Sequence, residues 1–486
     1  MPADAYPMYV GGAPYAPDRP SREVRGPGDG TVVGRVLLGT GEDVDRAVAA
    51  ANAAAPAQRR ASVFERADLC RTLAAAIEAN ADELARLLAR EHGKPYRTEA
   101  RGEVGAVATA FRDAADHVVS VRTESMPVRD PAKRVLVRRR PRGTYAVITP
   151  WNFPIGVAAI YYLAPGIAAG NTLVWTPAPT VSGVASLLTR VLHDAGLPPG
   201  VLNLVTGEGP VVGQAAIGHP GVHAVAFTGS TATGTAIVRA AAGKPVQLEL
   251  GGNGPSIVLD DADLDRAAAA IAGGSFANAG QICTSTERVL AHAGIAADLA
   301  ERIAAHAGKV VLGDPFAEDT TMGPVHTAEL ADRVCAQIAG AAAGGGRIVA
   351  GGGRPDGAPT PNYVRPTVVD DVPPDCDLHV AETFGPVAPI VRWRTLDELH
   401  RHVAASPFGL SGAVFGRDTA RALALAEDLP CGIVNLNEAS SYWEPNIPAG
   451  GTSGSGSGYG RTGGPWSIEE MTEQQAIVLT TDGGAR

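Results

Sequence analysis

The fold of this 486-residue chain is decided by the stretch Ala224-Val225-Ala226-Phe227-Thr228-Gly229-Ser230. Four apolar residues in a row are typical of a buried strand, and this strand ends at a glycine-containing turn. Comparable signals precede it, with strands expected at 172–175 and 201–205 and helices at 181–195 and 209–217. Strands that alternate with helices predict a doubly wound parallel sheet, whose ligands bind at the carboxyl ends of the strands. The fold class is therefore α/β.

The rest of the chain extends this pattern. Residues 1–40 are rich in proline and glycine and predict short strands or an irregular arm, whereas residues 43–91 have helical apolar spacing. Alternating strands are expected at 134–150, and a second α/β block at 255–436. The segment 475–479 reads as a lone strand near the end of the chain. Because it has no obvious partner, we expect it to pair with another subunit.

Length, charge and cysteine usage restrict the class of protein. The chain is too long for one core, so two or more domains are expected. A formal charge of −10 argues against a general nucleic-acid binder. Five widely spaced cysteines without a secretory segment favour a reducing cytoplasm. No apolar run reaches the length of a membrane helix, and no metal-binding motif is present, so no metal is expected.

Two local runs each allow two interpretations. The arginine-rich cluster 138–142 is either a solvated strand edge or subunit contact, which we favour, or a site for a polyanion. The Gly/Ser-rich run 450–460 is either a flexible linker or, as its short length favours, a loop beside a functional site.

Two glycine-containing turns are candidates for cofactor contacts. The turn Thr228-Gly229-Ser230 joins a buried strand to a helix, and a helix N-terminus suits a phosphate, although an ordinary N-cap would look the same. The second turn contains Gly209 and Gly213, but its GxGxxxG spacing is weak evidence for a dinucleotide.

Three residues stand in settings that suit catalysis. Cys283 follows a glycine-bearing turn, where a thiol can meet a substrate and backbone N–H donors. Glu249 lies between apolar residues before paired glycines, so that burial would raise its pKa toward that of a general base. Asn152 is held between two prolines and can donate to an oxyanion. Taken singly, a buried thiol, a salt-bridged strand glutamate and a turn asparagine are simpler explanations.

Five motifs occur in one order along the chain. They are Pro150-Trp151-Asn152-Phe153-Pro154, Phe227-Thr228-Gly229-Ser230-Thr231, Leu248-Glu249-Leu250-Gly251-Gly252, Gly280-Gln281-Ile282-Cys283 and Glu382-Thr383-Phe384-Gly385-Pro386-Val387. With this order the chain strongly resembles the aldehyde dehydrogenase superfamily almost from end to end. The resemblance implies two doubly wound, Rossmann-like α/β domains with a small β oligomerisation flap.

The resemblance also implies a role for each motif in NAD(P)-dependent oxidation of an aldehyde to a carboxylic acid. Cys283 would attack the aldehyde carbon, and Asn152 with the N–H of Cys283 would hold the oxyanion. Glu249 would activate the water that hydrolyses the thioester. Glu382 would bind the nicotinamide ribose, with Phe384 near the ring. The other residues expected at the cofactor are Ile148, Thr149, Pro150, Trp151, Thr176, Gly209, Gly213, Phe227, Thr228, Gly229, Ser230 and Leu250.

The same resemblance divides the chain. It implies a dinucleotide-binding domain at 1–119 and 142–250 and a catalytic domain at 251–447. Oligomerisation strands are expected at 120–141 and 467–486, and a glycine-rich loop at 448–466. The family is usually dimeric or tetrameric, so we expect a homodimer or homotetramer.

The chain departs from the family at two places. The usual Lys-Pro-x-Glu segment, which holds the adenosine ribose, reads Thr176-Pro177-Ala178-Pro179 here. This leaves NAD and NADP open and favours NAD, since a 2′-phosphate needs a cation; Arg239 could supply one. The segment Pro448-Ala449-Gly450-Gly451 and the loop 452–458 look closer to the aromatic-aldehyde branch, such as benzaldehyde or vanillin dehydrogenases.

Two substrate classes are compatible with these residues. An aromatic aldehyde would fit a pocket formed by Tyr161, Tyr162, Tyr442 and Trp443. An anionic aldehyde, such as a semialdehyde or phosphonate aldehyde, would need Arg112. The hydroxyls of Thr284, Ser285 and Thr286 could assist it, whereas Arg288 is expected to be structural. A CoA-acylating enzyme and a catalytically silent homologue are the alternative functions, and Glu249 argues against the first because transfer to CoA needs no water.

Overall fold

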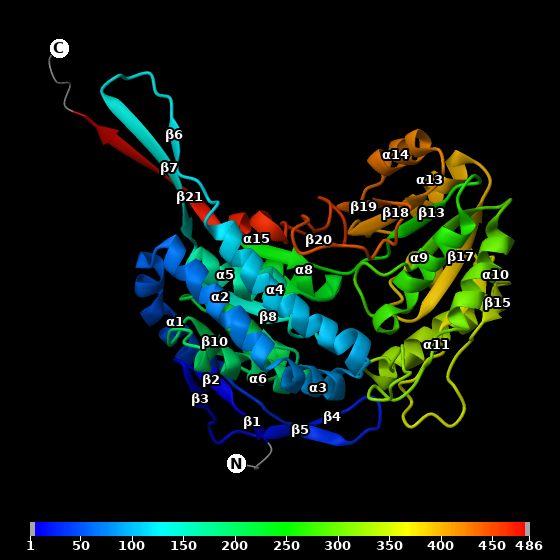
Figure 1. Cartoon of the computed structure of the whole chain (residues 1–486), viewed down its shortest axis with the longest axis horizontal. Helices are drawn as coiled ribbons and strands as arrows, with labels where there is room; N and C mark the ends of the chain where they lie inside the picture. The colour runs from blue at the N-terminus through cyan, green and yellow to red at the C-terminus, as the bar shows by residue number, and fades with distance from the viewer. Residues whose placement is uncertain (1–4, 482–486) are drawn as a thin grey trace.

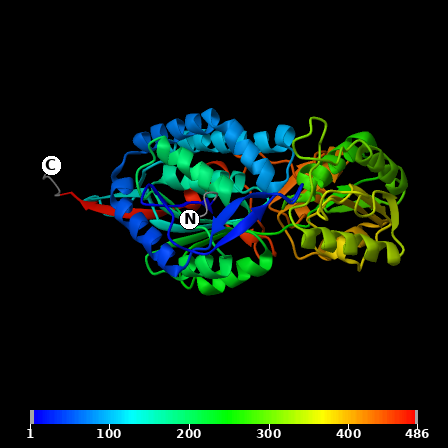
Figure 2. The same cartoon turned by 90° about the horizontal axis from the view of Figure 1, so that it is seen from below.

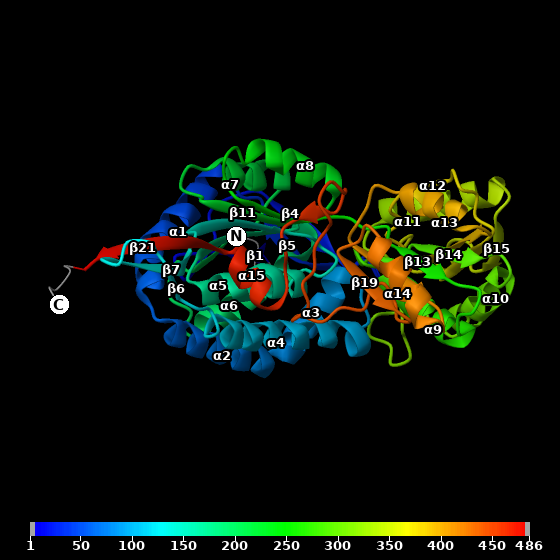
Figure 3. The same cartoon turned by 90° about the horizontal axis from the view of Figure 1, so that it is seen from above.

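The computed structural model describes residues 5–481 and has two α/β halves with a narrow β flap that projects from the first half. The first half is built mainly from the N-terminal half of the chain, and the second from the residues that follow (Figure 1). Viewed from above, the halves lie side by side, and the flap points away from the second half (Figure 3). Among residues 5–481, no helix combines the length and apolar character needed to cross a membrane.

The first half is organised around a sheet of eight strands. Five neighbouring strands are parallel, and the strands added at the two edges are antiparallel. In spatial order the strands are β20 (Gly458–Tyr459), β12 (Val246–Glu249), β11 (Ala224–Thr228), β8 (Thr144–Thr149), β9 (Thr172–Pro177), β10 (Leu202–Leu204), β2 (Met8–Val10) and β3 (Ala13–Tyr15). The stretch 224–228 is completely buried, as its apolar run predicts.

Helices lie on both sides of this sheet (Figure 2). They are α1 (Gly41–Arg60), α2 (Val63–Ala79), α3 (Ala81–His92), α4 (Arg101–Val118), α5 (Ala164–Ala169), α6 (Ser182–Asp194), α7 (Gln214–Gly218) and α8 (Thr231–Ala240). The helical spacing at 43–91 is confirmed, because the buried residues of α1 to α3 recur with that spacing. Three segments wind as π-helices: η1 (Tyr96–Ala100), η2 (Ala158–Leu163) and η4 (Gly209–Gly213). The helix expected at 209–217 is thus π-helical in its first turn.

The second half has its own sheet and its own apolar core. The sheet is parallel except at one edge, where β15 is antiparallel. Its strands are, in order, β15 (Arg347–Ala350), β16 (Thr367–Asp370), β17 (Val387–Trp393), β14 (Arg288–His292), β13 (Pro255–Val258), β18 (Ser411–Phe415) and β19 (Ile433–Leu436). Its helices are α9 (Leu264–Phe276), α10 (Ala296–Ala307), α11 (Ala328–Ala343), α12 (Asp377–Val380), α13 (Leu396–Ala404) and α14 (Thr419–Asp428). The α/β fold class is confirmed.

The prediction for the segment 475–479 is wrong. The segment 475–479 is not a lone strand, because β21 (Thr472–Thr480) pairs along its whole length with β7 (Lys133–Pro141) of the same chain. Together with β6 (Glu124–Met126) these strands form the flap. The partner lies more than 330 residues earlier, so no local sequence signal reveals it. The short helix α15 (Gly464–Glu470) connects the glycine-rich loop to β21.

The N-terminal arm also forms strands. β1 (Ala5–Tyr6), β5 (Val32–Leu37) and β4 (Ser21–Arg25) make a small separate sheet, and η3 (Pro179–Val181) packs against β4. This places Arg22 of the arm within reach of the turn that follows β10, where it pairs with Glu208.

Candidate active site

A strained turn presents Cys283. After α9, the short helix η5 (Ala277–Gly280) contains three successive residues with positive φ, namely Asn278 (49°), Ala279 (53°) and Gly280 (74°). A Cβ on Gly280 would lie 2.0 Å from the carbonyl oxygen of Gly385, so only glycine fits there. The backbone N–H of Asn278 donates to Glu99 at 2.8 Å. Strain of this kind persists only where the surroundings enforce it, and here it fixes the backbone that leads to the thiol.

Its surroundings favour the protonated form of the Cys283 thiol. Burial raises its pKa to about 12, and the nearby charges of Glu249 and Glu382 act in the same direction. The backbone N–H groups of Cys283 and Thr284 oppose this shift, since they donate to the sulfur. A Cβ on Gly252 would lie 2.0 Å from the carbonyl oxygen of Cys283, so the glycine allows the Glu249 strand end to approach the thiol loop.

Asn152 is buried, and hydrogen bonds hold both its side chain and its backbone carbonyl. Its side-chain Nδ2 donates to the carbonyl of Gln281 at 3.0 Å, which directs the amide along the loop that carries Cys283. Its backbone carbonyl accepts from Lys94 at 3.0 Å and from Asn278 at 3.2 Å. One N–H of the amide is thus used for orientation, and the other can be offered to a ligand in the cavity that Asn152 lines.

A buried ion pair supports Asn152, and sequence reasoning missed it. Lys94 Nζ donates to Glu103 Oε2 at 2.6 Å, and both side chains are almost fully buried. The other oxygen of Glu103 accepts from the backbone N–H of Ile155 (3.2 Å) and of Gly156 (2.8 Å), just after Asn152. The pair therefore ties the end of α3 and the start of α4 to the segment 152–156.

Glu249 ends β12 inside the protein. Burial raises its pKa to about 8; Arg461 acts in the opposite direction and Glu470 adds to the rise. Its Oε1 has no hydrogen-bond partner among the described residues. The glycine-rich run passes beside it, because β20 pairs with β12 and a Cβ on Gly450 would lie 3.2 Å from Oε1. A buried carboxyl with an unused oxygen and a pKa near neutrality suits a general base.

A second group of residues lines the same cavity. Thr228, Gly229 and Ser230 precede α8, and Ser230 caps this helix by accepting from the N–H of Thr233. Glu382 accepts from the N–H of Gly252 at 2.9 Å, which leaves its second oxygen for a ligand.

The segment around Glu382 and Phe384 is fixed by a residue that sequence reasoning missed. Glu287 is buried and accepts from the N–H of Thr383 and of Phe384, each at 2.8 Å. These two bonds hold Phe384 at a φ of 53°, with its ring edge-on to Trp151 at 5.6 Å. Trp151 in turn stacks on His326 at 4.6 Å. No motif pointed to Glu287 or His326, because their roles depend on contacts between distant segments.

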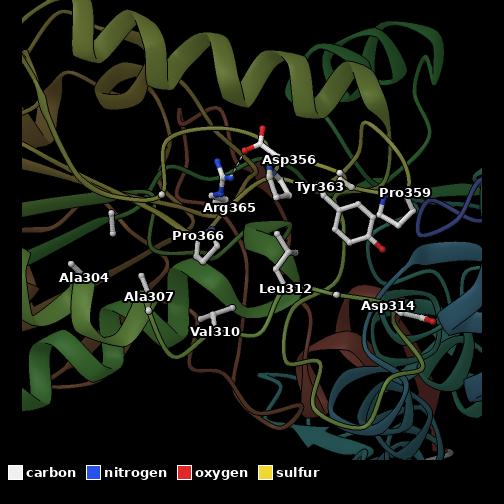
Figure 4. A pocket seen from close by; sticks show the side chains of 17 residues that line it. Ala304, Ala307, Val310, Leu312, Asp314, Asp356, Pro359, Tyr363, Arg365 and Pro366 are labelled. Carbon is white, nitrogen blue, oxygen red and sulfur yellow. Dashed lines mark ion pairs between the residues drawn. The ribbon is translucent and has the colours of Figure 1, made fainter.

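One cavity of about 550 Å³ brings most of the predicted residues together. Those that line it are Pro150, Trp151, Asn152, Tyr161, Thr228, Gly229, Ser230, Glu249, Leu250, Cys283, Thr284, Glu382, Phe384 and Trp443. A separate cavity of similar volume lies in the second half around Tyr363 and the Asp356–Arg365 ion pair, and it contains none of these residues (Figure 4).

The remaining cofactor candidates are distributed along the first sheet. They lie outside the lining of the thiol cavity: Ile148 and Thr149 end β8, Thr176 is in β9, Phe227 is in β11, and Gly209 and Gly213 bound η4. Thr149 Oγ1 accepts from the indole of Trp175 at 2.8 Å.

Three substrate candidates need correction. Arg112 forms an ion pair with Glu78 between α4 and α2, because helical spacing turns it away from the cavity. Tyr442 is exposed, and its hydroxyl donates to Glu444 at 2.7 Å. Tyr162 is buried beside the cavity, but its hydroxyl bonds to Thr228 Oγ1 at 2.6 Å. Ser285 and Thr286 are also buried, with their hydroxyls bonded to Gly274 and to Ser440.

A thiol, a carboxyl with a raised pKa and a glycine-containing turn before a helix line one cavity, an arrangement that suits an oxidoreductase acting on aldehydes with a nicotinamide cofactor. The chain belongs to the aldehyde dehydrogenase family, whose model matches residues 15–477. It is 36% identical over 457 residues to a 3,6-anhydro-alpha-L-galactose dehydrogenase of Streptomyces coelicolor, covering 93% of this chain and 92% of that protein. It is 36% identical over 461 residues to a glutarate-semialdehyde dehydrogenase of Pseudomonas putida, covering 94% of each.

A solved structure has the same fold. PnpE from Pseudomonas sp. WBC-3 superposes with a TM-score of 0.93 at 35% identity, covering 99% of each chain, and PnpE has also been solved in complex with nicotinamide adenine dinucleotide. The chain is therefore an NAD(P)-dependent aldehyde dehydrogenase, and neither the CoA-acylating nor the silent alternative gains support from these relatives.

Proposed function

We propose that Cys283, Asn152 and Glu249 carry out the oxidation, and that the substrate is a small aldehyde with a flat apolar or aromatic body. The observation that carries this proposal is the shared cavity, in which the thiol, the amide and the buried carboxyl face the same space. The cofactor would accept the hydride, and Thr228, Gly229, Ser230 and Glu382 would hold it.

The residues act in two stages. The Cys283 sulfur adds to the aldehyde carbon as its proton passes to solvent water, and the oxyanion that forms is held by Asn152 Nδ2 and the N–H of Cys283. Loss of hydride leaves a thioester on Cys283. Glu249 then accepts a proton from water, which attacks the thioester and releases the carboxylic acid. Positioning matters because the thiol is not activated in advance: its raised pKa means that deprotonation accompanies attack.

The lining of the cavity supports an apolar or aromatic substrate. Tyr161 and Trp443 meet edge to face at 5.6 Å on the thiol side. Among the described residues that line the cavity, the cations are limited to Arg333, which donates to the carbonyl of Thr383 at the Phe384 end. Because Arg112 lies elsewhere, an anionic tail would meet no cation near the thiol. The glutarate-semialdehyde relative supports an anionic aldehyde as the second candidate.

NAD is the cofactor that the chain is proposed to prefer. The hydroxyl of Thr176 is buried and has no partner among residues 5–481. Because a hydroxyl is neutral, Thr176 offers no charge to an adenosine ribose. A carboxylate is supplied instead by Glu208, at the turn after β10, where it pairs with Arg22 at 2.5 Å. A carboxylate near strand ends accepts from ribose hydroxyls and repels a 2′-phosphate.

The experiment is an aldehyde panel with both cofactors. Benzaldehyde and glutarate semialdehyde are compared by kcat/KM, and Cys283→Ala is the control that should lose oxidation while it keeps cofactor affinity. We expect benzaldehyde to exceed the semialdehyde by at least tenfold. The opposite ranking would replace the aromatic substrate by the anionic one, and turnover by Cys283→Ala would refute the assigned nucleophile.

Assembly and compartment complete the proposal. We propose a homodimer or homotetramer formed through the flap, whose strands expose Met126, Val478 and Leu479. All five cysteines are free, which supports a reducing cytoplasmic environment.

A further inference from the structure

The arginine-rich segment 138–142 belongs to a second concave site outside the thiol cavity. A cavity of about 580 Å³ is lined by residues of β7, of β21 and of the junction between α1 and α2. Figure 1 shows β7 and β21 where they leave the body of the molecule. Six arginines line it, and no described aspartate or glutamate does. The arginines are Arg59, Arg60, Arg66, Arg138, Arg139 and Arg140.

Local folding brings these arginines together from three elements. Arg59 and Arg60 end α1, where cations are favoured by the helix dipole. Arg66 lies in the first turn of α2, which begins after the N-cap Ser62. The other three follow one another on β7, whose pairing with β21 fixes their positions.

Most of this charge is not neutralised within the chain. Arg139 pairs with Glu469 at 3.7 Å and Arg140 with Glu473 at 2.6 Å. Arg138 donates to the neutral amide oxygen of Gln475 at 3.0 Å. Arg59, Arg60, Arg66 and Arg138 form no ion pair with a carboxylate among residues 5–481.

Arg66 is the buried member of the cluster. It is 8% exposed, and its guanidinium donates only to carbonyls in this structure, those of Ala168 at 2.7 Å and of Ala61. Arginine cannot lose its proton in proteins, so this charge cannot be relieved by deprotonation. Four like charges around one hollow repel one another unless a counter-ion occupies it.

We propose that this cavity is a binding site for a small multivalent oxyanion, such as a compound with a phosphate pair or several carboxylates. Guanidinium groups recognise both through paired N–H donors. A concave shape lined by four cations without carboxylate partners favours a small ligand over a flat protein contact, and the overall charge of −10 makes the concentration of cations here a local feature. The proposal is independent of the oxidation chemistry, because none of the residues assigned to that chemistry lines this cavity.

The test is calorimetric titration of the full-length protein with inorganic pyrophosphate at low salt, with citrate as the second arm. Saturating NAD is present throughout, so that the phosphate-binding turn at Thr228–Ser230 is occupied. The variant is Arg59→Ala/Arg60→Ala, both exposed at the end of α1. The matched control is Arg134→Ala, an exposed arginine of β7 that does not line the cavity.

We expect saturable binding by the wild type, a Kd at least tenfold higher in the double variant, and a Kd within twofold of wild type in Arg134→Ala. Arg138→Ala should weaken binding in the same way and gives a second test on another element. Equal weakening by Arg134→Ala would show a diffuse surface effect and overturn the site. Absence of binding, or a change of oligomeric state in the double variant without pyrophosphate binding, would assign these arginines to a contact between subunits and also overturn it.

Discussion

At the scale of single residues, Glu249 combines burial, a free oxygen and a raised pKa. Because its pKa is about 8, the carboxyl is mostly protonated at pH 6 and cannot accept a proton from water. We predict that thioester hydrolysis rises about tenfold per pH unit up to pH 8 and levels off above it. Single-turnover acyl-enzyme decay, followed from pH 6 to pH 9.5, measures this. In Glu249→Gln the decay should be about 10²–10⁴-fold slower and independent of pH.

The same pKa shift has a consequence for stability. A carboxyl whose pKa is higher in the folded state binds more protons folded than unfolded, so its contribution is present at low pH and is lost as pH rises toward 8. The free energy of unfolding of the wild type should therefore fall relative to that of Glu249→Gln between pH 5 and pH 9. Parallel curves for the two proteins would contradict the shifted pKa.

Glu208 provides the residue-scale prediction for cofactor choice. Replacing Glu208 by Gln removes the negative charge near the proposed ribose position and frees Arg22 to meet a 2′-phosphate. We predict that kcat/KM for NADP rises at least tenfold while that for NAD changes by less than threefold. The control is Glu23→Gln in β4, whose carboxylate pairs with Arg25 and Arg35. An unchanged NADP/NAD ratio in Glu208→Gln would remove Glu208 from cofactor selection.

At the scale of elements, the Lys94–Glu103 pair joins α3, α4 and the segment after β8. Lys94→Met leaves the Glu103 carboxylate buried without its cation, which costs about 3–5 kcal/mol of stability. We predict that Lys94→Met/Glu103→Leu recovers part of this loss in urea unfolding, since apolar residues of similar size replace the pair. The N–H groups of Ile155 and Gly156 that lose Glu103 limit the recovery.

In the same variants, the measured activity distinguishes a role of the ion pair in positioning Asn152 from a role in stability alone. The double variant should fold and bind NAD like the wild type, yet its kcat should be at least tenfold lower, because the carbonyl of Asn152 has lost its Lys94 donor and the N–H groups of Ile155 and Gly156 have lost Glu103. Full activity in the stable double variant would show that the pair is structural only.

The sequence predicted those features that depend on neighbouring residues. The alternation of strands and helices, the turn at 228–230 and the setting of Cys283 are local, and each lies where expected. Lys94, Glu103 and Glu287 could not be found, since their partners are fixed only when separate elements pack. Arg112 failed for a related reason: a residue on a helix faces the cavity or the neighbouring helix according to a rotation that its own sequence leaves open.

At the scale of the whole molecule, the flap leaves apolar side chains uncovered. Val478 is 59% exposed and Leu479 is 47% exposed, on a strand that has one partner strand among residues 5–481. An uncovered sheet edge of this kind is a template for pairing with another copy. Because β21 pairs with β7, we expect the flap as a whole, and not a lone strand, to contact the next subunit.

A variant with charges on β21 tests this arrangement. Val478→Asp/Leu479→Asp places two charges on the exposed end of β21, where they would have to be buried in an assembly at a cost of several kcal/mol. Light scattering coupled to size-exclusion chromatography should give an oligomer for the wild type and a monomer for the variant. Leu423→Asp is the control, since Leu423 is equally exposed on α14 in the second half of the molecule. Because the flap lies on the far side of the first half from the second half, each monomer should keep its thiol cavity intact. An oligomer that survives both aspartates would place the subunit contact elsewhere on the molecule.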